Sequence, residues 1–167
     1  MQPPGKPLLA LTAGDLMTRA VVTIPQAMSL QSAARLLSQA SISGAPVVDA
    51  AGRCVGVLSA TDFVSWAQKP EGAAKGGRPE PAPEVHSAWQ VIDFEALPVS
   101  EVSRYMTPDP VTVAPSAPVG ELARKMVDAH IHRVIVVDEQ GRPVGIVSST
   151  DILAAVARTA REPTAAE

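Results

Sequence analysis

The 167-residue sequence is poor in cysteine, in aromatic residues and in long apolar runs. Its one cysteine, Cys54, cannot form an internal disulfide or build a cysteine-based zinc site, and we expect a packed thiol rather than a nucleophile. Aromatic residues make up only 3%, so alanine and aliphatic side chains must fill any core. No run approaches the roughly 18 apolar residues of a membrane span, and the N-terminus lacks the apolar stretch of a signal peptide, which favours a cytoplasmic location.

The sequence also lacks the common signals of catalysis and of nucleic-acid binding. A net charge of −3 argues against a protein that neutralises phosphate backbones, so DNA or RNA binding is a minor possibility. The motifs of phosphate-binding loops, dinucleotide sites, serine hydrolases and zinc proteases are all absent, and we expect no enzyme activity. His130 and His132 have no third ligand nearby in the sequence, so we expect no metal site.

What the sequence does contain is an internal repeat. Apolar residues make up 46% and charged residues 19%, which allows a buried core. Between residues 17 and 62, 18 of 46 positions are identical to the residues 89 positions further on. Met17-Thr18 matches Met106-Thr107, for example. The chain is therefore a tandem of two similar units.

Each repeat predicts the order strand, helix, strand, strand, helix. A short extended stretch precedes a helical pattern, with apolar residues at i, i+3, i+4 and i+7 and Ser29 as the N-cap in the first repeat. Two valine-rich strands with a tight turn and a second helix follow. One repeat of about 50 residues is small for an independent core, so we expect an α/β (α+β) fold in which the two pack sheet to sheet.

The repeats and the segments between them suggest domain boundaries. We expect an extension at 1–13, repeats at 14–67 and 103–157, a linker at 68–102 and a frayed tail at 158–167. Within the linker, 69–83 is rich in proline, glycine and charge and should be flexible, whereas 86–97 is apolar enough to dock on the protein. A partner-binding element is the alternative for the apolar segment.

The strongest motif is Gly-h-h-Ser-x-Thr-Asp, where h is an apolar residue, and it occurs at 56–62 and 145–151. One interpretation is a capping box, in which Ser59 or Ser148 caps a helix and the aspartate stands at its third position. The other is a ligand site, because a carboxylate at a helix start, beside two hydroxyls, can accept both hydrogen bonds of a ribose diol. The local sequence leaves both open.

These motifs, together with Ser-Gly-Ala-Pro-Val-Val-Asp at 43–49, resemble the cystathionine β-synthase (CBS) domain. The resemblance implies two CBS domains related by a pseudo-twofold axis, a pair known as a Bateman module. It implies clefts between the domains that bind an adenosine-containing ligand (AMP, ADP, ATP or S-adenosylmethionine). It also implies a homodimer that regulates an effector protein.

The resemblance assigns site residues by their match to the family motif. Asp62 and Asp151 match the ribose-binding aspartates, and the neighbouring hydroxyls lie near ribose and phosphate. Apolar side chains flank the base, and the first strand of each repeat lies beside the adenine. The implied ligand-binding set is Thr23, Ile42, Ser43, Gly44, Ala45, Val57, Ser59, Thr61 and Asp62 in the first repeat, and Thr112, Ile131, His132, Arg133, Val134, Ile146, Ser148, Thr150 and Asp151 in the second.

The second repeat differs from the first at one informative position. His132-Arg133 replaces Ser43-Gly44, and this pair resembles the phosphate contacts of nucleotide-sensing CBS proteins. Arginine offers a fixed fork of donors that suits phosphate oxygens. A solvated arginine and a partly buried histidine are the alternative. We expect unequal clefts, with the better site at Asp151.

The function that follows is a non-catalytic sensor of an adenosine-containing ligand, with its output in a partner protein. The alternative is a ligand-free dimerisation or assembly module whose clefts are filled by side chains. The sequence does not choose among the adenosine ligands.

Overall fold

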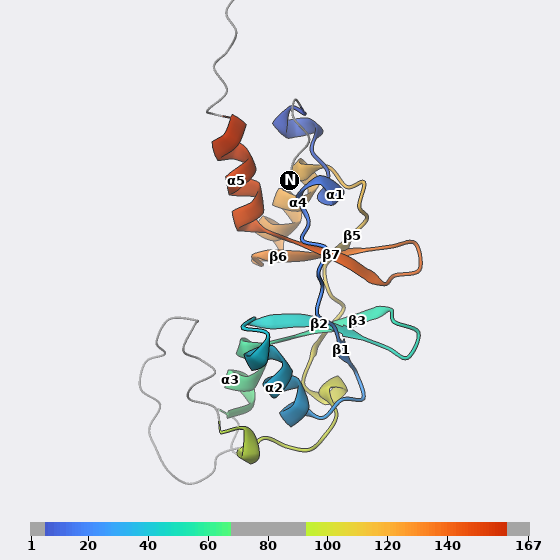
Figure 1. Ribbon diagram of the computed structural model, residues 1–167, viewed down its shortest axis with the longest axis vertical. Helices are drawn as coiled ribbons and strands as arrows, with labels where there is room; N and C mark the ends of the chain where they lie inside the picture. The colour runs from blue at the N-terminus through green and yellow to red at the C-terminus, as the bar shows by residue number, and fades with distance from the viewer. Residues whose placement is uncertain (1–5, 68–92, 160–167) are drawn as a thin grey trace, which may run out of the picture. The chain divides into compact units, whose positions relative to one another are not determined.

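A computed structural model describes residues 6–67 and 93–159, which form two separate packing units (Figure 1). The first, which we call the β1–β4 unit, consists of residues 22–110, and the second, the β5–β7 unit, combines residues 1–21 with 111–167. The linker segment 69–83 and most of the segment 86–97 lie outside the two described ranges. None of the helices in the described ranges has the length and apolar composition that a membrane crossing requires.

The β1–β4 unit holds a four-stranded sheet in the order β1-β2-β3-β4. Strand β1 runs parallel to β2, and the other two pairs are antiparallel. In chain order its elements are β1 (Ile24–Pro25), α2 (Leu30–Gln39), β2 (Gly44–Val48), β3 (Cys54–Ser59), α3 (Ala60–Ala67), the 3₁₀ turns η3 (Phe94–Ala96) and η4 (Val102–Arg104), and β4 (Thr107–Pro108).

The β5–β7 unit holds a three-stranded sheet in the order β5-β6-β7, with β5 parallel to β6 and β6 antiparallel to β7. Its elements are η1 (Leu8–Ala10), α1 (Ala13–Leu16), β5 (Thr112–Val113), α4 (Val119–Asp128), β6 (Arg133–Val137), β7 (Pro143–Ser148) and α5 (Ser149–Thr159). Each repeat therefore has the predicted order of strand, helix, strand, strand, helix. Helix α5 includes two residues of the segment expected to be a frayed tail.

Aliphatic side chains and alanine make up most of both cores, and Phe63, which is 2% exposed, is the largest buried side chain of the β1–β4 unit. Helix α2 buries its predicted stripe, and Ser29 caps it by accepting a hydrogen bond from the Ser32 amide at 3.2 Å. In the other unit α4 buries Leu122 completely, and Val134 and Val147 are buried on the sheet beside it. Each unit thus has its own apolar interior.

The hairpins between the paired strands follow one repeated design. Asp49 accepts the amides of Ala51 and Arg53 through Oδ1, both at 2.9 Å, and Arg53 Nε donates to its other oxygen. Gly52 stands at φ 80°, where a side chain would be strained. The turn after β6 repeats these contacts with Asp138, Gln140 and Arg142. The Asp-x-x-Gly-Arg pattern is therefore a turn motif.

The boundaries of the packing units differ from those of the repeats. Thr18, in the first repeat, pairs with Ile146 on β7 of the second repeat. In the same way β4, in the second repeat, pairs with β3 of the first. A methionine side chain in each segment covers a strand glycine, Met17 over Gly145 and Met106 over Gly56. The leading Met-Thr segment of each repeat thus pairs with the sheet of the other repeat.

The described end of the apolar linker segment, residues 93–97, packs on the β1–β4 unit. Leu97 is only 3% exposed and Phe94 packs on the same core. Gln31 Nε2 on α2 donates to the Leu97 carbonyl at 2.9 Å, and Arg35 forms an ion pair with Glu95. Residues 86–92 lie outside the described ranges.

Candidate functional site

The repeated aspartates cap the helices that they begin. Asp151 Oδ2 accepts the Ser148 amide at 2.7 Å and the Ser148 hydroxyl at 2.6 Å, and the Asp151 amide donates back to Ser148 Oγ at 3.2 Å. Asp62 Oδ2 accepts the Ser59 amide at 2.7 Å and its hydroxyl at 2.9 Å. The capping interpretation is correct for one oxygen of each carboxylate. A ligand could use only the other oxygen.

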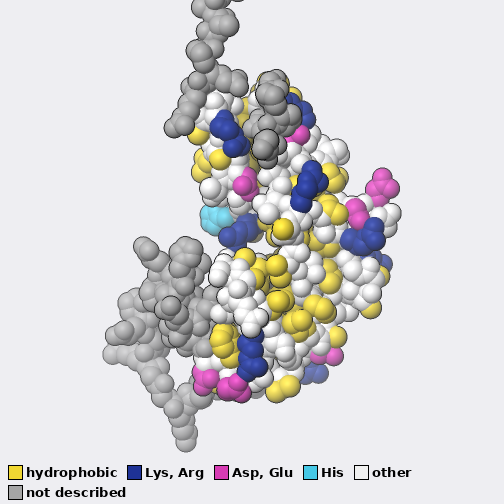
Figure 2. Space-filling view, viewed as in Figure 1, with side chains coloured by type: hydrophobic (Ala, Val, Ile, Leu, Met, Phe, Trp, Pro, Cys, Tyr) yellow, Lys and Arg dark blue, Asp and Glu magenta, His cyan; other side chains and the backbone are white. Residues whose placement is uncertain are grey.

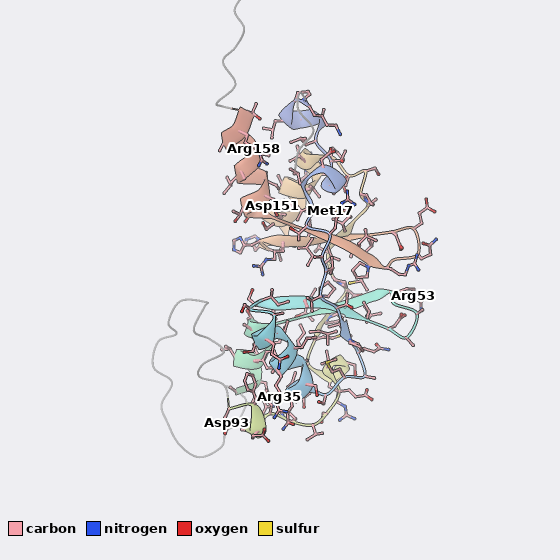
Figure 3. The ribbon with its side chains drawn as sticks, in the orientation of Figure 1. Met17, Arg35, Arg53, Asp93, Asp151 and Arg158 are labelled. Carbon is pink, nitrogen blue, oxygen red and sulfur yellow. The ribbon has the colours of Figure 1, made fainter. Side chains whose placement is uncertain are left out.

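The second oxygens, Oδ1, of the two carboxylates differ in their hydrogen-bond partners. Asp62 Oδ1 accepts a hydrogen bond from the Thr107 hydroxyl at 3.1 Å. Asp151, at the first turn of α5 (Figure 3), has no hydrogen bond to Oδ1 from any residue in the described ranges. Its side chain is half-buried. Asp151 therefore keeps one acceptor oxygen for a ligand.

A basic pair lies beside the start of α5. Arg133, the first residue of β6, stands opposite Ser148, the last residue of β7. The Ser149 amide donates to the His132 carbonyl at 2.9 Å, which fixes the chain just before β6 next to the helix start. His132 and Arg133 are both exposed, and histidine is visible at the molecular surface in Figure 2. An anionic group near Asp151 could thus reach a guanidinium.

The equivalent corner of the β1–β4 unit is built the same way without the basic pair. Gly44 stands opposite Ser59, and the Ala60 amide donates to the Ser43 carbonyl at 2.8 Å. Serine and glycine supply no positive charge at this position. The two corners therefore share a backbone and differ in electrostatics.

Apolar and hydroxyl side chains meet at Ile146 on β7. Ile146, half-buried, stands directly between Ile135 on β6 and Thr18. Residues opposite one another on neighbouring strands share a face. Ile146 and Thr18 thus extend one surface from β7, the strand that leads to Asp151.

The structure brings most of the predicted site residues together within each unit. Residues 42–45 join Ser59, Thr61 and Asp62 at one corner, and residues 131–134 join Ser148, Thr150 and Asp151 at the other. Ala45 and Val134 are at most 1% exposed and their side chains belong to the cores, so only their backbone could meet a ligand.

The predicted residues on the first strands lie apart from these corners. Thr112 is on β5, with β6 between it and β7, and Thr23 directly precedes β1, with β2 between it and β3. Within a unit, neither lies beside the aspartate of its own repeat. Their assignment to the adenine remains a prediction.

The sequence reasoning missed two residues that the fold brings close to the corners. Thr107 bonds Asp62, and Thr18 pairs with Ile146. Both belong to the Met-Thr pairs that recur 89 residues apart, so the repeat did carry a signal. What it could not reveal is that each pair packs on the other repeat.

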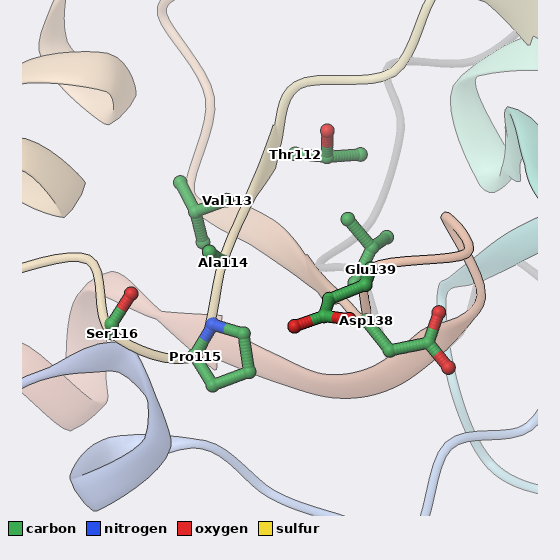
Figure 4. Close-up of a pocket in the computed structure, with 8 residues that line it drawn as sticks. Thr112, Val113, Ala114, Pro115, Ser116, Asp138 and Glu139 are labelled. Carbon is green, nitrogen blue, oxygen red and sulfur yellow. The ribbon is translucent and has the colours of Figure 1, made fainter.

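A pocket of about 390 Å³ lies elsewhere in the β5–β7 unit (Figure 4). It lies at the carboxyl ends of β5 and β6, whereas Arg133 is at the amino end of β6. Both oxygens of Asp138, which lines it, accept hydrogen bonds within the hairpin turn. It includes only one predicted site residue and is not the expected nucleotide site. Its lining is Thr112, Val113, Ala114, Pro115, Ser116, Val137, Asp138 and Glu139.

Cys54 is half-buried at the start of β3, and His130 and His132 lie between α4 and β6. Burial raises the pKa of the half-buried Cys54 thiol, which donates to the Gly56 carbonyl at 3.7 Å, so the thiolate nucleophile is disfavoured. His130 stands at φ 54° where α4 ends, two residues from His132. Over the described ranges, no three His, Cys, Asp or Glu side chains are grouped to hold a metal ion.

Comparison with known proteins gives one family. A profile of the CBS domain matches residues 13–69 and 99–158, which together are most of the chain. A curated relative, homoserine O-acetyltransferase of Methanococcoides burtonii, is 27% identical over 141 residues. That match covers 84% of this chain and 23% of the relative, so the chain spans about a quarter of that protein's length.

Three solved structures have the same fold. The CBS domain of a CBS domain-containing membrane protein from Sphaerobacter thermophilus is 33% identical, with a TM-score of 0.66 and 89% of each chain covered. The cytosolic domain of the Mg²⁺ channel MgtE, in complex with ATP, is 31% identical (TM-score 0.62; 86% of this chain and 48% of that one). The CBS domain pair of protein MJ0100, in complex with 5′-methylthioadenosine and S-adenosyl-L-methionine, is 25% identical (TM-score 0.62; 87% and 99%).

Proposed function

The chain belongs to the CBS domain family, and we propose that it is a non-catalytic regulatory module that binds an adenosine-containing ligand at the Asp151 corner of the β5–β7 unit. The observation that carries the proposal is Oδ1 of Asp151, which no described residue hydrogen-bonds, at a helix start whose preceding residue, Ser148, stands opposite Arg133. Ligands containing adenosine are bound by two of the solved relatives, MgtE and MJ0100.

The corner offers a distinct group for each part of such a ligand. Asp151 Oδ1 accepts a hydrogen bond from a ribose hydroxyl, while Oδ2 stays in the helix cap. Ile146 and the sheet surface around it supply apolar contact for the base. Arg133 donates to phosphate oxygens through its planar fork, and His132 adds a second donor when a phosphate is present.

A regulatory role follows from binding that favours one arrangement of the protein over another. A ligand can shift such an equilibrium only by its difference in affinity for the two arrangements. Thr18 joins the Asp151 corner from the other repeat, so a ligand there contacts both halves of the sequence. We expect the output in an effector protein, and the cytoplasmic location expected from the sequence stays a prediction.

A homodimer is part of the proposal. Helix α5 exposes Leu153 by 66% and Val156 by 44%, and these residues stand three apart on one helix face. A second copy of the chain would cover this apolar face. Exposed apolar residues also favour the second candidate function, a ligand-free assembly module in which the aspartates act only as caps.

Isothermal titration of the purified chain with AMP, ADP, ATP and S-adenosylmethionine separates the two functions. Saturable binding of at least one ligand, weakened by Asp151→Asn, supports the sensor. Asparagine keeps an amide oxygen for the Ser148 cap and removes the negative charge, so the helix start should survive. A stable dimer that binds none of the four ligands supports the assembly module instead.

A further inference from the structure

The second aspartate, Asp62, has every carboxylate oxygen engaged within the protein. Oδ2 accepts two hydrogen bonds from Ser59, and Oδ1 accepts the hydroxyl of Thr107 at 3.1 Å. A ribose hydroxyl that approached Oδ1 would meet a donor already in place. The Asp62 corner therefore differs from the Asp151 corner at the atom that a ligand would use.

The backbone holds Thr107 at this position. Thr107 stands opposite Val57 in the pairing of β4 with β3, so its side chain lies on the Val57 side of the sheet. Directly before it, Met106 covers Gly56, where an added Cβ would lie 2.6 Å from the methionine sulfur. The backbone of Thr107 thus cannot move away without breaking a strand pair and a packed contact.

The corresponding threonine of the other repeat makes no such bond. Thr18 exchanges two backbone hydrogen bonds with Ile146, at 2.9 and 3.0 Å, and Met17 covers Gly145. The register is the same, yet among the described residues Thr18 is not hydrogen-bonded to Asp151. The difference lies in the threonine side chain and not in the strand pairing.

We propose that Thr107 is an internal competitor that weakens binding of an adenosine ligand at the Asp62 corner, so that the chain fills the Asp151 corner first. The inference rests on the proposed function, because it concerns the second copy of the same site. The absence of a basic pair at Ser43-Gly44 acts in the same direction for phosphate-bearing ligands. The ligand class is the same at both corners, and Thr107 contributes to their order of filling together with the missing basic pair.

The size of the effect follows from the bond that must be displaced. The net free energy of one hydrogen bond between protein groups corresponds to about a three- to tenfold change in an equilibrium constant. Removing the Thr107 hydroxyl should therefore tighten binding at Asp62 by about three- to tenfold. Valine has nearly the same shape and cannot donate, which makes Thr107→Val the appropriate change.

The test uses AMP as the probe and isolates each corner. In Asp151→Asn only the Asp62 corner remains, and we expect Thr107→Val in this background to lower the dissociation constant for AMP three- to tenfold. The control is the Asp62→Asn variant, in which only the Asp151 corner remains. Adding Thr18→Val to this variant should not raise its affinity for AMP. Thermal melting of each variant confirms that it is folded.

Three outcomes separate the proposals. Tighter AMP binding on Thr107→Val, without tighter binding on Thr18→Val, supports the competitor role. Equal affinity of Asp151→Asn with and without Thr107→Val, including no binding by either, overturns it while leaving the Asp151 site intact. If the unmodified chain binds none of the four adenosine compounds, the proposed function fails, and this inference fails with it.

Discussion

The side chain of Met17 lies directly over Gly145, so that a Cβ on this glycine would come within 2.8 Å of the methionine Cβ. The two residues belong to different repeats, and the contact holds the leading segment of the first repeat on β7 of the second. Met106 and Gly56 form the equivalent contact in the β1–β4 unit.

These contacts predict that Gly145→Ala and Gly56→Ala are both destabilising. Overpacking a tight contact costs about 1–3 kcal/mol, and the added methyl at Gly56 would also lie 2.9 Å from the Thr107 carbonyl oxygen. Urea unfolding measures the change. Gly120→Ala is the control, because nothing lies within 4 Å of a Cβ there and the residue is inside α4. It should stabilise by about 0.5–1 kcal/mol, and equal effects at all three glycines would contradict the packing account.

Asp151 should matter for binding beyond its role as a cap. Asp151→Ala and Asp62→Ala each remove a helix-capping carboxylate, and we expect each to cost about 1 kcal/mol of unfolding free energy. Only Asp151→Ala should also abolish high-affinity binding of an adenosine ligand. Denaturant unfolding and calorimetric titration of the same samples give both quantities, and equal losses of affinity in the two variants would argue against the preference for Asp151.

Arg133 should select for phosphate. A charge-assisted hydrogen bond is worth about 1.5–3 kcal/mol, so Arg133→Ala should weaken binding of AMP or ATP about tenfold or more. Adenosine itself, which has no phosphate, should lose little. Comparing the three ligands by titration gives this contrast, and a uniform loss for all of them would mean that Arg133 supports the fold of the corner instead.

The hairpin aspartates predict a loss of stability in acid. The hydrogen bond from the Arg142 amide, together with the arginine side chain and the Gln140 amide, lowers the pKa of Asp138 from its usual 3.8. The Arg53 amide is the main cause of the lowered pKa of Asp49, in the same way. A lowered pKa in the folded state adds stability that is fully present above the unfolded value and is lost as the pH falls through the folded one.

Urea midpoints between pH 7 and pH 2.5 test this expectation. Stability should fall below about pH 5, and Asp138→Asn should flatten the part of the curve that depends on this turn. Glu139→Gln, on the same turn but exposed and outside these hydrogen bonds, serves as the control. A curve unchanged by Asp138→Asn would show that the acid transition comes from other carboxylates.

The exposed face of α5 should mediate self-association. Leu153→Glu introduces a charge in the centre of this face, and burying it in a dimer interface would be strongly unfavourable. We expect sedimentation velocity to show a dimer for the unmodified chain and a monomer for Leu153→Glu. Val99→Glu, at a side chain that is 76% exposed in the β1–β4 unit, should leave the dimer intact. If Leu153→Glu remains dimeric, the interface lies elsewhere.

The sequence by itself determined the repeat, the order of elements in each half and the stripe of α2, and it offered the two helix caps as one of two interpretations. These features depend on residues within one or two turns of each other, such as Ser148 and Asp151, three positions apart. The sequence likewise indicated the corner where residues 131–134 meet the start of α5, through its resemblance to a known family.

Only the tertiary structure decided which half receives each Met-Thr segment, and with it the bond between Thr107 and Asp62 across 45 residues. Local preference is the same in both repeats and cannot say whether a short strand pairs with its own sheet or with the other. The pairing is decided by packing, because a methionine side chain fits against a glycine on the strand of the other repeat. Side-chain competition for a single carboxylate oxygen is visible only after that packing is known.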